Sequence, residues 1–134
     1  MLTSLALALL LAPQLVDKTA QPTTPLPAGL TPERRGDIFM ARRMYREAVD
    51  TYQEALTDPK QKDRSHILYN KLGIAYHQQA QFGPARRYYE RAIRLNRDYA
   101  EAVNNLGTVH YALKSYRRAI SQYRQALRDR KSVV

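Results

Sequence analysis

Several residue types and patterns are missing from this 134-residue sequence, and each absence removes a class of protein. The chain has no cysteine, which excludes disulfides, thiolate metal sites, cysteine nucleophiles and a lipid-modified N-terminal cysteine. It has no apolar run as long as the roughly 20 residues of a membrane-spanning helix. A hydrophobic content of 44% is still enough for a packed core. These observations predict one small domain, or a domain with a tail, carrying a formal charge of +10.

The signatures of catalysis are missing as well. The three histidines occur singly, and none has metal-ligand spacing with another histidine. The glycines form no phosphate-cradling loop, and paired carboxylates such as Glu33 and Asp37 are expected on an open face, with no deep pocket to shift their pKa. The sequence therefore predicts no enzyme, no metal and no cofactor.

Residues 1–16 form an apolar N-terminal segment. Its first twelve residues, MLTSLALALLLA, would extend only about 18 Å as a helix, against about 30 Å of hydrocarbon, so the length fits a secretory signal better than an anchor. However, no Lys or Arg precedes the run and no clear small-x-small site follows it. The alternatives are a misplaced start codon or an apolar arm that packs on the domain. We expect export to the periplasm or medium, and otherwise a cytoplasmic protein.

Residues 17–30 are predicted to be a linker. Pro22, Pro25 and Pro27 lie close together there, and prolines at this spacing oppose a helix and favour extended chain.

A repeat fills the rest of the chain. After each of three glycines, which are 37 and 34 residues apart, an aromatic residue follows at nine positions, alanine at twelve, tyrosine at sixteen and alanine at nineteen. The extra length of the first interval fits a polar loop at residues 57–64. Aromatic residues aside, the repeat-defining positions are Gly36, Ala48, Tyr52 and Ala55, then Gly73, Ala85, Tyr89 and Ala92, then Gly107, Ala119, Tyr123 and Ala126.

The spacing within each unit predicts two antiparallel helices. The glycine and the first alanine allow the helices to approach closely, and the tyrosines and leucines are expected to fill the space between units. Thr31 is expected to cap the first helix, and Pro84 suits the first turn of a later one.

This pattern resembles the tetratricopeptide repeat, a helix-turn-helix unit of 34 residues. The resemblance implies an all-α fold, an α-solenoid of three repeats at residues 31–62, 66–99 and 100–133. The chain departs from the family at the tryptophan near each start, which is Pro32 in the first unit, and at the leucine before the glycine, which is Arg35 there. Where the repeat has a packed aromatic residue the third unit has His110, which we expect in the core or an interface.

The resemblance also implies a concave groove, lined by the first helix of each unit, that binds a peptide or a partner segment. Asn70 and Asn104 are 34 residues apart and are expected to lie one above the other, where their amides could hydrogen-bond a peptide backbone. The alternative is that they are merely solvated polar residues. The groove residues implied are Asn70, Ile74, His77 and Gln78 from the second unit, and Asn104, Thr108 and Tyr111 from the third.

One subclass of the family clamps the C-terminal carboxylate of heat-shock chaperones with Lys, Asn and Arg. This chain has Glu33, Asp37 and Glu101 at three of those positions. Because carboxylates would repel a ligand carboxylate, chaperone-tail binding of that kind is disfavoured.

Positive charge is concentrated in the second half of the chain. Residues 83–134 have twelve Lys/Arg against four Asp/Glu, whereas residues 31–82 have nine against seven. These basic residues have three interpretations. They form a solvated face whose charges offset the negative ends of the helix dipoles, a surface for an acidic protein or anionic membrane, or a surface for nucleic acid. We expect a single outer basic patch of Arg94, Arg97, Arg117, Arg124, Arg128 and Lys131.

The sequence thus predicts a non-catalytic protein–protein interaction module that binds a peptide or protein segment in its groove. The alternative is a basic adaptor that binds nucleic acid or an anionic surface through its convex Arg-rich face. The last unit is expected to expose apolar side chains, which predicts self-association or stacking on a partner chain.

Overall fold

The computed structural model describes residues 24–131. The predicted signal or apolar segment, the first half of the predicted linker and the last residues of the predicted third repeat lie outside that range. Within it the chain forms helices and no strand: α1 (Pro32–Ala41), α2 (Tyr45–Leu56), the 3₁₀ helix η1 (Pro59–Arg64), α3 (Ser65–Gln78), α4 (Phe82–Leu95), α5 (Ala100–Ala112) and α6 (Tyr116–Lys131).

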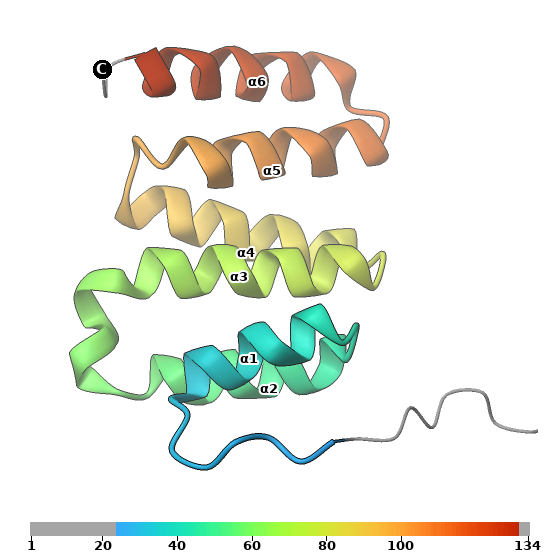
Figure 1. Ribbon diagram of the computed structural model, residues 1–134. Coiled ribbons are helices and arrows are strands. Elements are labelled where there is room, and N and C mark those ends of the chain that lie inside the picture. Colours follow the sequence, from blue (N-terminus) through green and yellow to red (C-terminus); the bar gives the residue numbers. More distant parts are fainter. Residues whose placement is uncertain (1–23, 132–134) are drawn as a thin grey trace, which may run out of the picture.

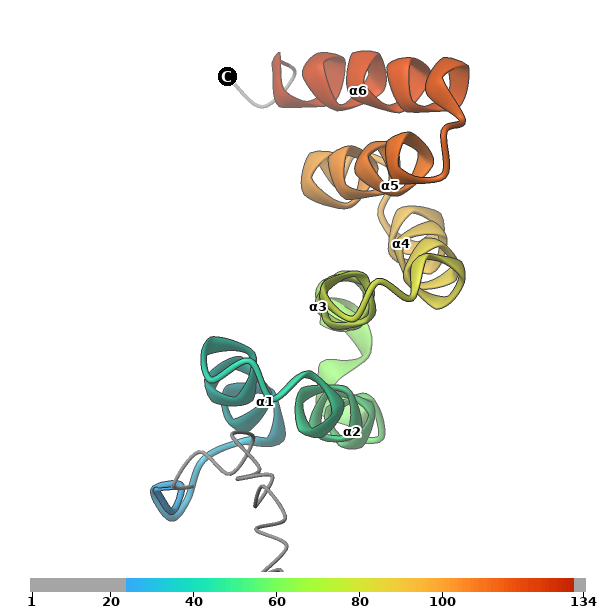
Figure 2. The same cartoon turned by 90° about the vertical axis from the view of Figure 1, so that its right-hand side faces the viewer.

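The helices form three antiparallel pairs that follow one another along a single stack (Figure 1). In the orthogonal view, α1, α3 and α5 line the inner side of a curve, and α2 and α4 lie on its outer side (Figure 2). The predicted all-α solenoid is confirmed. No described helix is long and apolar enough to cross a bilayer.

Local sequence sets where the helices begin and end. The Thr31 hydroxyl accepts a hydrogen bond from the Arg34 amide at 3.3 Å, with Pro32 as the first helical residue, so this predicted cap is confirmed. Each pair is joined by a tight turn whose key residue has a left-handed backbone: Arg43 (φ 60°), Ala80 (φ 56°) and Lys114 (φ 58°).

The connection between the first two units differs from the one predicted from the sequence. The sequence predicts a polar loop at residues 57–64, but the structure has the 3₁₀ helix η1 over most of it. The Asp58 carboxylate accepts a hydrogen bond from the Lys60 amide at 2.9 Å, and Pro59 fixes the backbone angle of the first turn. The extra residues therefore form an ordered connection.

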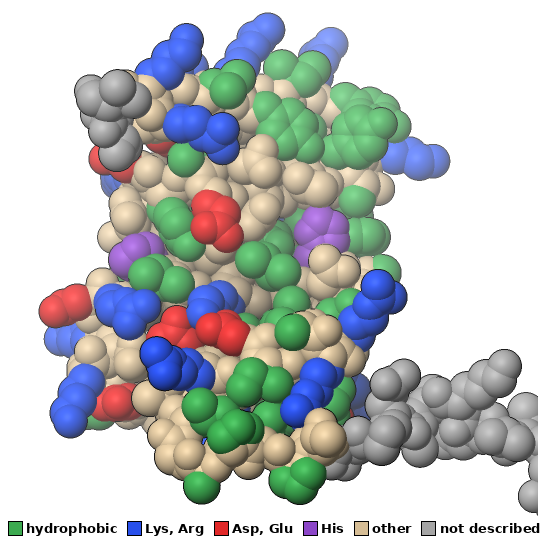
Figure 3. Space-filling view, viewed as in Figure 1, with side chains coloured by type: hydrophobic (Ala, Val, Ile, Leu, Met, Phe, Trp, Pro, Cys, Tyr) green, Lys and Arg blue, Asp and Glu red, His purple; other side chains and the backbone are tan. Residues whose placement is uncertain are grey.

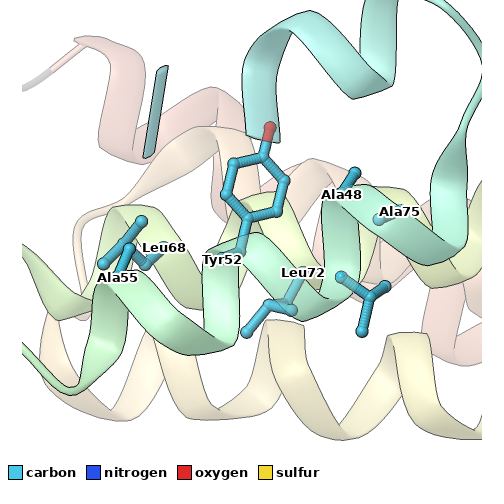
Figure 4. Close-up of a cluster of buried hydrophobic side chains, with 7 residues drawn as sticks. Ala48, Tyr52, Ala55, Leu68, Leu72 and Ala75 are labelled. Carbon is cyan, nitrogen blue, oxygen red and sulfur yellow. The ribbon is translucent and has the colours of Figure 1, made fainter. Parts of the chain in front are cut away.

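The core is built on contacts between glycine and tyrosine. The repeat glycines lie inside helices, and the ring of Tyr89 stands so close to Gly73 that a Cβ there would lie 2.5 Å from ring carbon Cε1. Figure 4 shows the matching ring, Tyr52, in one cluster with Leu68 and Leu72 of the next unit, all at most 1% exposed. One tyrosine thus closes the interface within its unit and contributes to the interface between units.

Candidate functional site

The concave face is the surface formed by α1, α3 and α5, and Figure 3 looks onto it. Acidic and basic side chains meet near its middle, and hydrophobic side chains gather at one upper corner, over the turn between α5 and α6. The residues that the sequence assigns to a groove come from α3 and α5.

On α5, Asn104, Thr108 and Tyr111 follow one another at intervals of one helical turn. Asn104 is exposed, and its side-chain amide forms no hydrogen bond with any described residue. Thr108 donates to the Asn104 carbonyl at 3.2 Å, and the Tyr123 hydroxyl donates to Thr108 at 3.5 Å. The Tyr111 side chain is 62% exposed. This row offers a free amide at one end and a large open ring at the other.

On α3, Ile74 and His77 are half-buried and Gln78 is exposed. The His77 ring lies edge-on to Phe82, with ring centroids 5.4 Å apart. Burial lowers the pKa of His77 below its usual 6.5, so the imidazole is neutral at pH 7 and keeps one donor and one acceptor nitrogen.

Asn70 does not fit the expectation of a ligand-facing amide. It is 1% exposed, and its Nδ2 donates to Glu101 at 2.9 Å and to the Tyr99 hydroxyl at 3.3 Å. Its Oδ1 accepts from Asn105 Nδ2 at 3.1 Å. Because side chains of the third unit close over it, Asn70 joins two units, and Asn104 alone of the expected pair is open to solvent.

A charged cluster at the junction of α1 and α3 was not predicted from the sequence. Lys71 Nζ lies 2.8 Å from Glu33 Oε1 and 2.7 Å from Asp37 Oδ1, and the Tyr52 hydroxyl donates to Asp37 at 2.7 Å. Burial would lower the pKa of Lys71, but its hydrogen bonds to Asp37 and Glu33 outweigh burial and raise it. The one available signal was opposite charge on successive units, 34 and 38 residues apart.

This cluster also bears on anion recognition. Lys71 binds the chain's own carboxylates, and Arg64 lies 3.7 Å from Glu33. The cations nearest to these two carboxylates are therefore engaged with them, and a ligand carboxylate would meet Glu33 and Asp37.

The six predicted basic residues are all exposed. Lys and Arg side chains project from α6 at the end of the stack (Figure 3). That the basic residues of α6 form one continuous patch with Arg94 and Arg97 stays a prediction. Among residues 24–131, no group of three His, Asp or Glu side chains is placed to hold a metal ion.

Comparison with known families agrees with this architecture. Two sequence profiles, both described as "Tetratricopeptide repeat", match residues 36–65 and 70–132. Together they span all three helix pairs.

Named relatives come from algae and cyanobacteria. "Uncharacterized protein ycf37" of Guillardia theta is 30% identical over 95 residues, which are 69% of this chain and 53% of that protein. "Photosystem I assembly protein Ycf3" of Rippkaea orientalis is 37% identical over 81 residues, 58% of this chain and 45% of that protein. The chain thus spans about half the length of the curated relatives it matches.

Solved structures share the fold. The Sgt2 TPR domain from Aspergillus fumigatus matches with a TM-score of 0.69 at 24% identity, covering 81% of this chain and 70% of that one. The first TPR of Spaghetti (RPAP3), solved with the HSP90 peptide SRMEEVD, matches with a TM-score of 0.67 at 23% identity, covering 73% and 75%.

Proposed function

Because the chain belongs to the tetratricopeptide-repeat family, we propose that it is a non-catalytic interaction module that binds an extended segment of a partner protein on its concave face. The observation that carries the proposal is the open row on α5. Asn104 presents an unengaged amide, and Tyr111 presents a ring that is 62% exposed; both belong to α5, a helix on the inner side of the curve.

The chemistry of this row suits a peptide. An asparagine amide can donate to a backbone carbonyl and accept from a backbone N–H, whatever the sequence of the ligand. An exposed tyrosine ring can bury a ligand side chain with little loss of its own conformational freedom. The Spaghetti (RPAP3) domain of the same fold was solved with a bound peptide, which supports this mode of use.

The charges of the concave face limit which kind of segment it can bind. Lys71 is occupied by Glu33 and Asp37, and Glu101 accepts from Asn70. Asp37 and Glu101 are exposed carboxylates, whereas the open positions among the predicted groove residues are neutral: Asn104, Tyr111, Gln78, and the half-buried Ile74 and His77. The segment we propose is therefore an internal, uncharged stretch with an apolar or aromatic side chain for Tyr111, and not an acidic chain terminus.

The names of the relatives suggest a setting for this binding. Cyanobacterial relatives at 37% identity are called photosystem I assembly proteins. We propose that this chain likewise holds a segment of a protein subunit while a larger complex is assembled.

A capture experiment tests the groove. The full chain, the variant Asn104→Ala/Tyr111→Ala and the control Thr57→Ala/Ser121→Ala serve as baits for extracts of the source cells. All replaced side chains are exposed, so all three baits should fold equally, as judged by circular dichroism. We expect partners that the wild type and the control retain and the groove variant loses. Equal capture by all three baits contradicts the proposal.

The exposure of all six predicted basic residues keeps a second candidate: a basic adaptor for nucleic acid or an anionic surface. The salt dependence of binding distinguishes the two candidate functions. Affinity that depends on phosphate contacts falls steeply as salt rises, whereas binding to the uncharged row should change little. Titrating the captured partner at low and high salt therefore assigns the binding to one face.

A further inference from the structure

The convex side of the stack carries a furrow that the concave groove does not use. Its lining residues come from α2, η1, α3, α4 and the turn between α3 and α4. Two adjoining hollows of about 540 and 440 Å³ share Arg91 and Arg94, and a third of about 200 Å³ shares Tyr76 and Gln81 with the first. Of the six residues predicted for a basic patch, Arg94 alone lines these hollows.

Three tyrosines form a wall in this furrow. Tyr88 lies between Tyr76, at 5.3 Å between ring centroids and 9° between planes, and Tyr69, at 6.2 Å and 24°. All three rings pack against the buried cluster of α2 and α3, so their positions are fixed. Gln53 of α2 donates to the Tyr88 hydroxyl at 3.4 Å, and the Arg91 guanidinium lies 5.1 Å from the centre of the Tyr69 ring.

The furrow holds positive charge without acidic partners. Arg87, Arg91 and Arg94 lie within two turns of α4, and none forms an ion pair with a described residue. The acidic residues that also line the hollows are Asp50 and Glu90, and Glu90 lies 3.7 Å from Arg86. Like charges one turn apart repel each other, so a bound anion would relieve a repulsion that the free protein retains.

The spacing of the arginines defines the ligand. Arg87 and Arg91 are four residues apart, about 6 Å along the helix axis, and alternate residues of an extended chain are about 7 Å apart. An arginine fork binds a carboxylate through two parallel hydrogen bonds. We propose that this furrow binds an extended acidic segment of a partner protein, with carboxylates at alternate positions.

The arrangement of the rings favours a peptide over a nucleic acid. Bases bind single-stranded sites by stacking on open aromatic faces. Here Tyr88 is flanked by two rings, and Tyr69 has Tyr88 and Arg91 as neighbours. The wall offers phenol hydroxyls and ring edges beside guanidinium groups, and not a row of separate platforms.

A titration of the full chain tests the furrow. The probe is a short fluorescein-labelled peptide in which glutamate and serine alternate, followed by fluorescence anisotropy at moderate salt. The variant Arg87→Gln/Arg91→Gln removes two charges from the furrow. The control Arg117→Gln/Arg124→Gln removes two charges from exposed positions on α6 and so has the same net charge.

We expect the furrow variant to bind the peptide about tenfold more weakly than wild type, and the control to change affinity by less than about twofold. Both variants should keep the wild-type circular dichroism spectrum. Equal weakening by both variants would show non-directional attraction and overturn the proposal, as would no weakening by either. Tighter binding of an oligothymidylate of matched charge, lost in the furrow variant, would also overturn it. The groove variant Asn104→Ala/Tyr111→Ala should bind the acidic peptide like wild type, so the two proposals stand or fall separately.

Discussion

At the scale of single residues, one missing methyl group decides whether the two helices of a unit can meet. The rings of Tyr52, Tyr89 and Tyr123 occupy the space that a Cβ would need at the glycine of each unit. Tyr89 is 1% exposed, so its ring cannot swing away into solvent. A glycine inside a helix costs up to about 1 kcal/mol relative to alanine, and the packed ring offsets that cost.

Gly73→Ala should therefore destabilise the protein by about 2–3 kcal/mol, since the buried ring must shift. The matched control is Gly83→Ala, also in a helix, where the nearest atom to a new Cβ is the Arg87 side chain at 3.8 Å. We expect the control to change stability by less than about 1 kcal/mol, because the gain from alanine is opposed by Pro84, which disfavours a helical backbone in the residue before it. Urea unfolding of both variants checks this, and equal effects would contradict it.

A second prediction at this scale concerns His110, which is 6% exposed. Burial, with Arg118 and Arg86 nearby, lowers its pKa below 6.5, and Glu90 acts weakly the other way. The folded state thus resists protonation, so this contribution to stability is complete above about pH 6.5 and is lost as pH falls below that value.

His110→Phe should therefore flatten the fall in unfolding free energy between about pH 7.5 and 5, by up to about 1.4 kcal/mol for each unit of the pKa shift. The slope should not vanish, because burial also lowers the pKa of His77. Urea titrations across this pH range measure it. An identical pH profile for variant and wild type would show that His110 titrates normally in the folded protein.

At the scale of the helices, the sequence predicts which elements form but not how side chains of neighbouring units share their interface. The repeat period, the positions of the glycines and alanines, and the Thr31 cap can all be read from the spacing of residues along one sequence. The burial of Asn70 depends on Tyr99, Glu101 and Asn105, which reach it only after the units stack. The link from Lys71 to Glu33 and Asp37 arises in the same way.

The interface between units predicts different results for the two asparagines. Asn70→Ala removes a buried amide with its three hydrogen bonds to Tyr99, Glu101 and Asn105, and should cost about 1–3 kcal/mol of stability. Asn104→Ala, at an exposed position, should change stability by less than about 0.5 kcal/mol while weakening partner binding. Thermal unfolding with a binding assay measures both. A large stability loss from Asn104→Ala would mean that its amide is structural.

At the scale of the whole molecule, apolar side chains remain uncovered at the α6 end of the stack. Tyr116, Ile120 and Leu127 are 51%, 50% and 58% exposed among the described residues. In a helical stack, each unit buries its apolar surface against the next. This surface is therefore suited to a further helical layer, whether from a second copy or from a partner.

We predict that the full chain self-associates through this surface at concentrations of tens of micromolar. Ile120→Lys/Leu127→Lys should yield monomers, because charged side chains cannot be buried in an apolar interface at low cost. Light scattering over a concentration series gives the answer. A well-folded wild-type monomer throughout would refute self-association.

The central claim is that the concave face holds a partner's extended segment, and site-specific photocrosslinking in the source cells tests it most directly. A benzophenone side chain replaces Tyr111 on the concave face in one protein and Thr57, which is exposed at the end of α2, in another. The account predicts that position 111 yields adducts that map by mass spectrometry to one contiguous segment of one partner, and that position 57 yields none of that segment. Adducts of the same partner from position 57, with none from position 111, would contradict it.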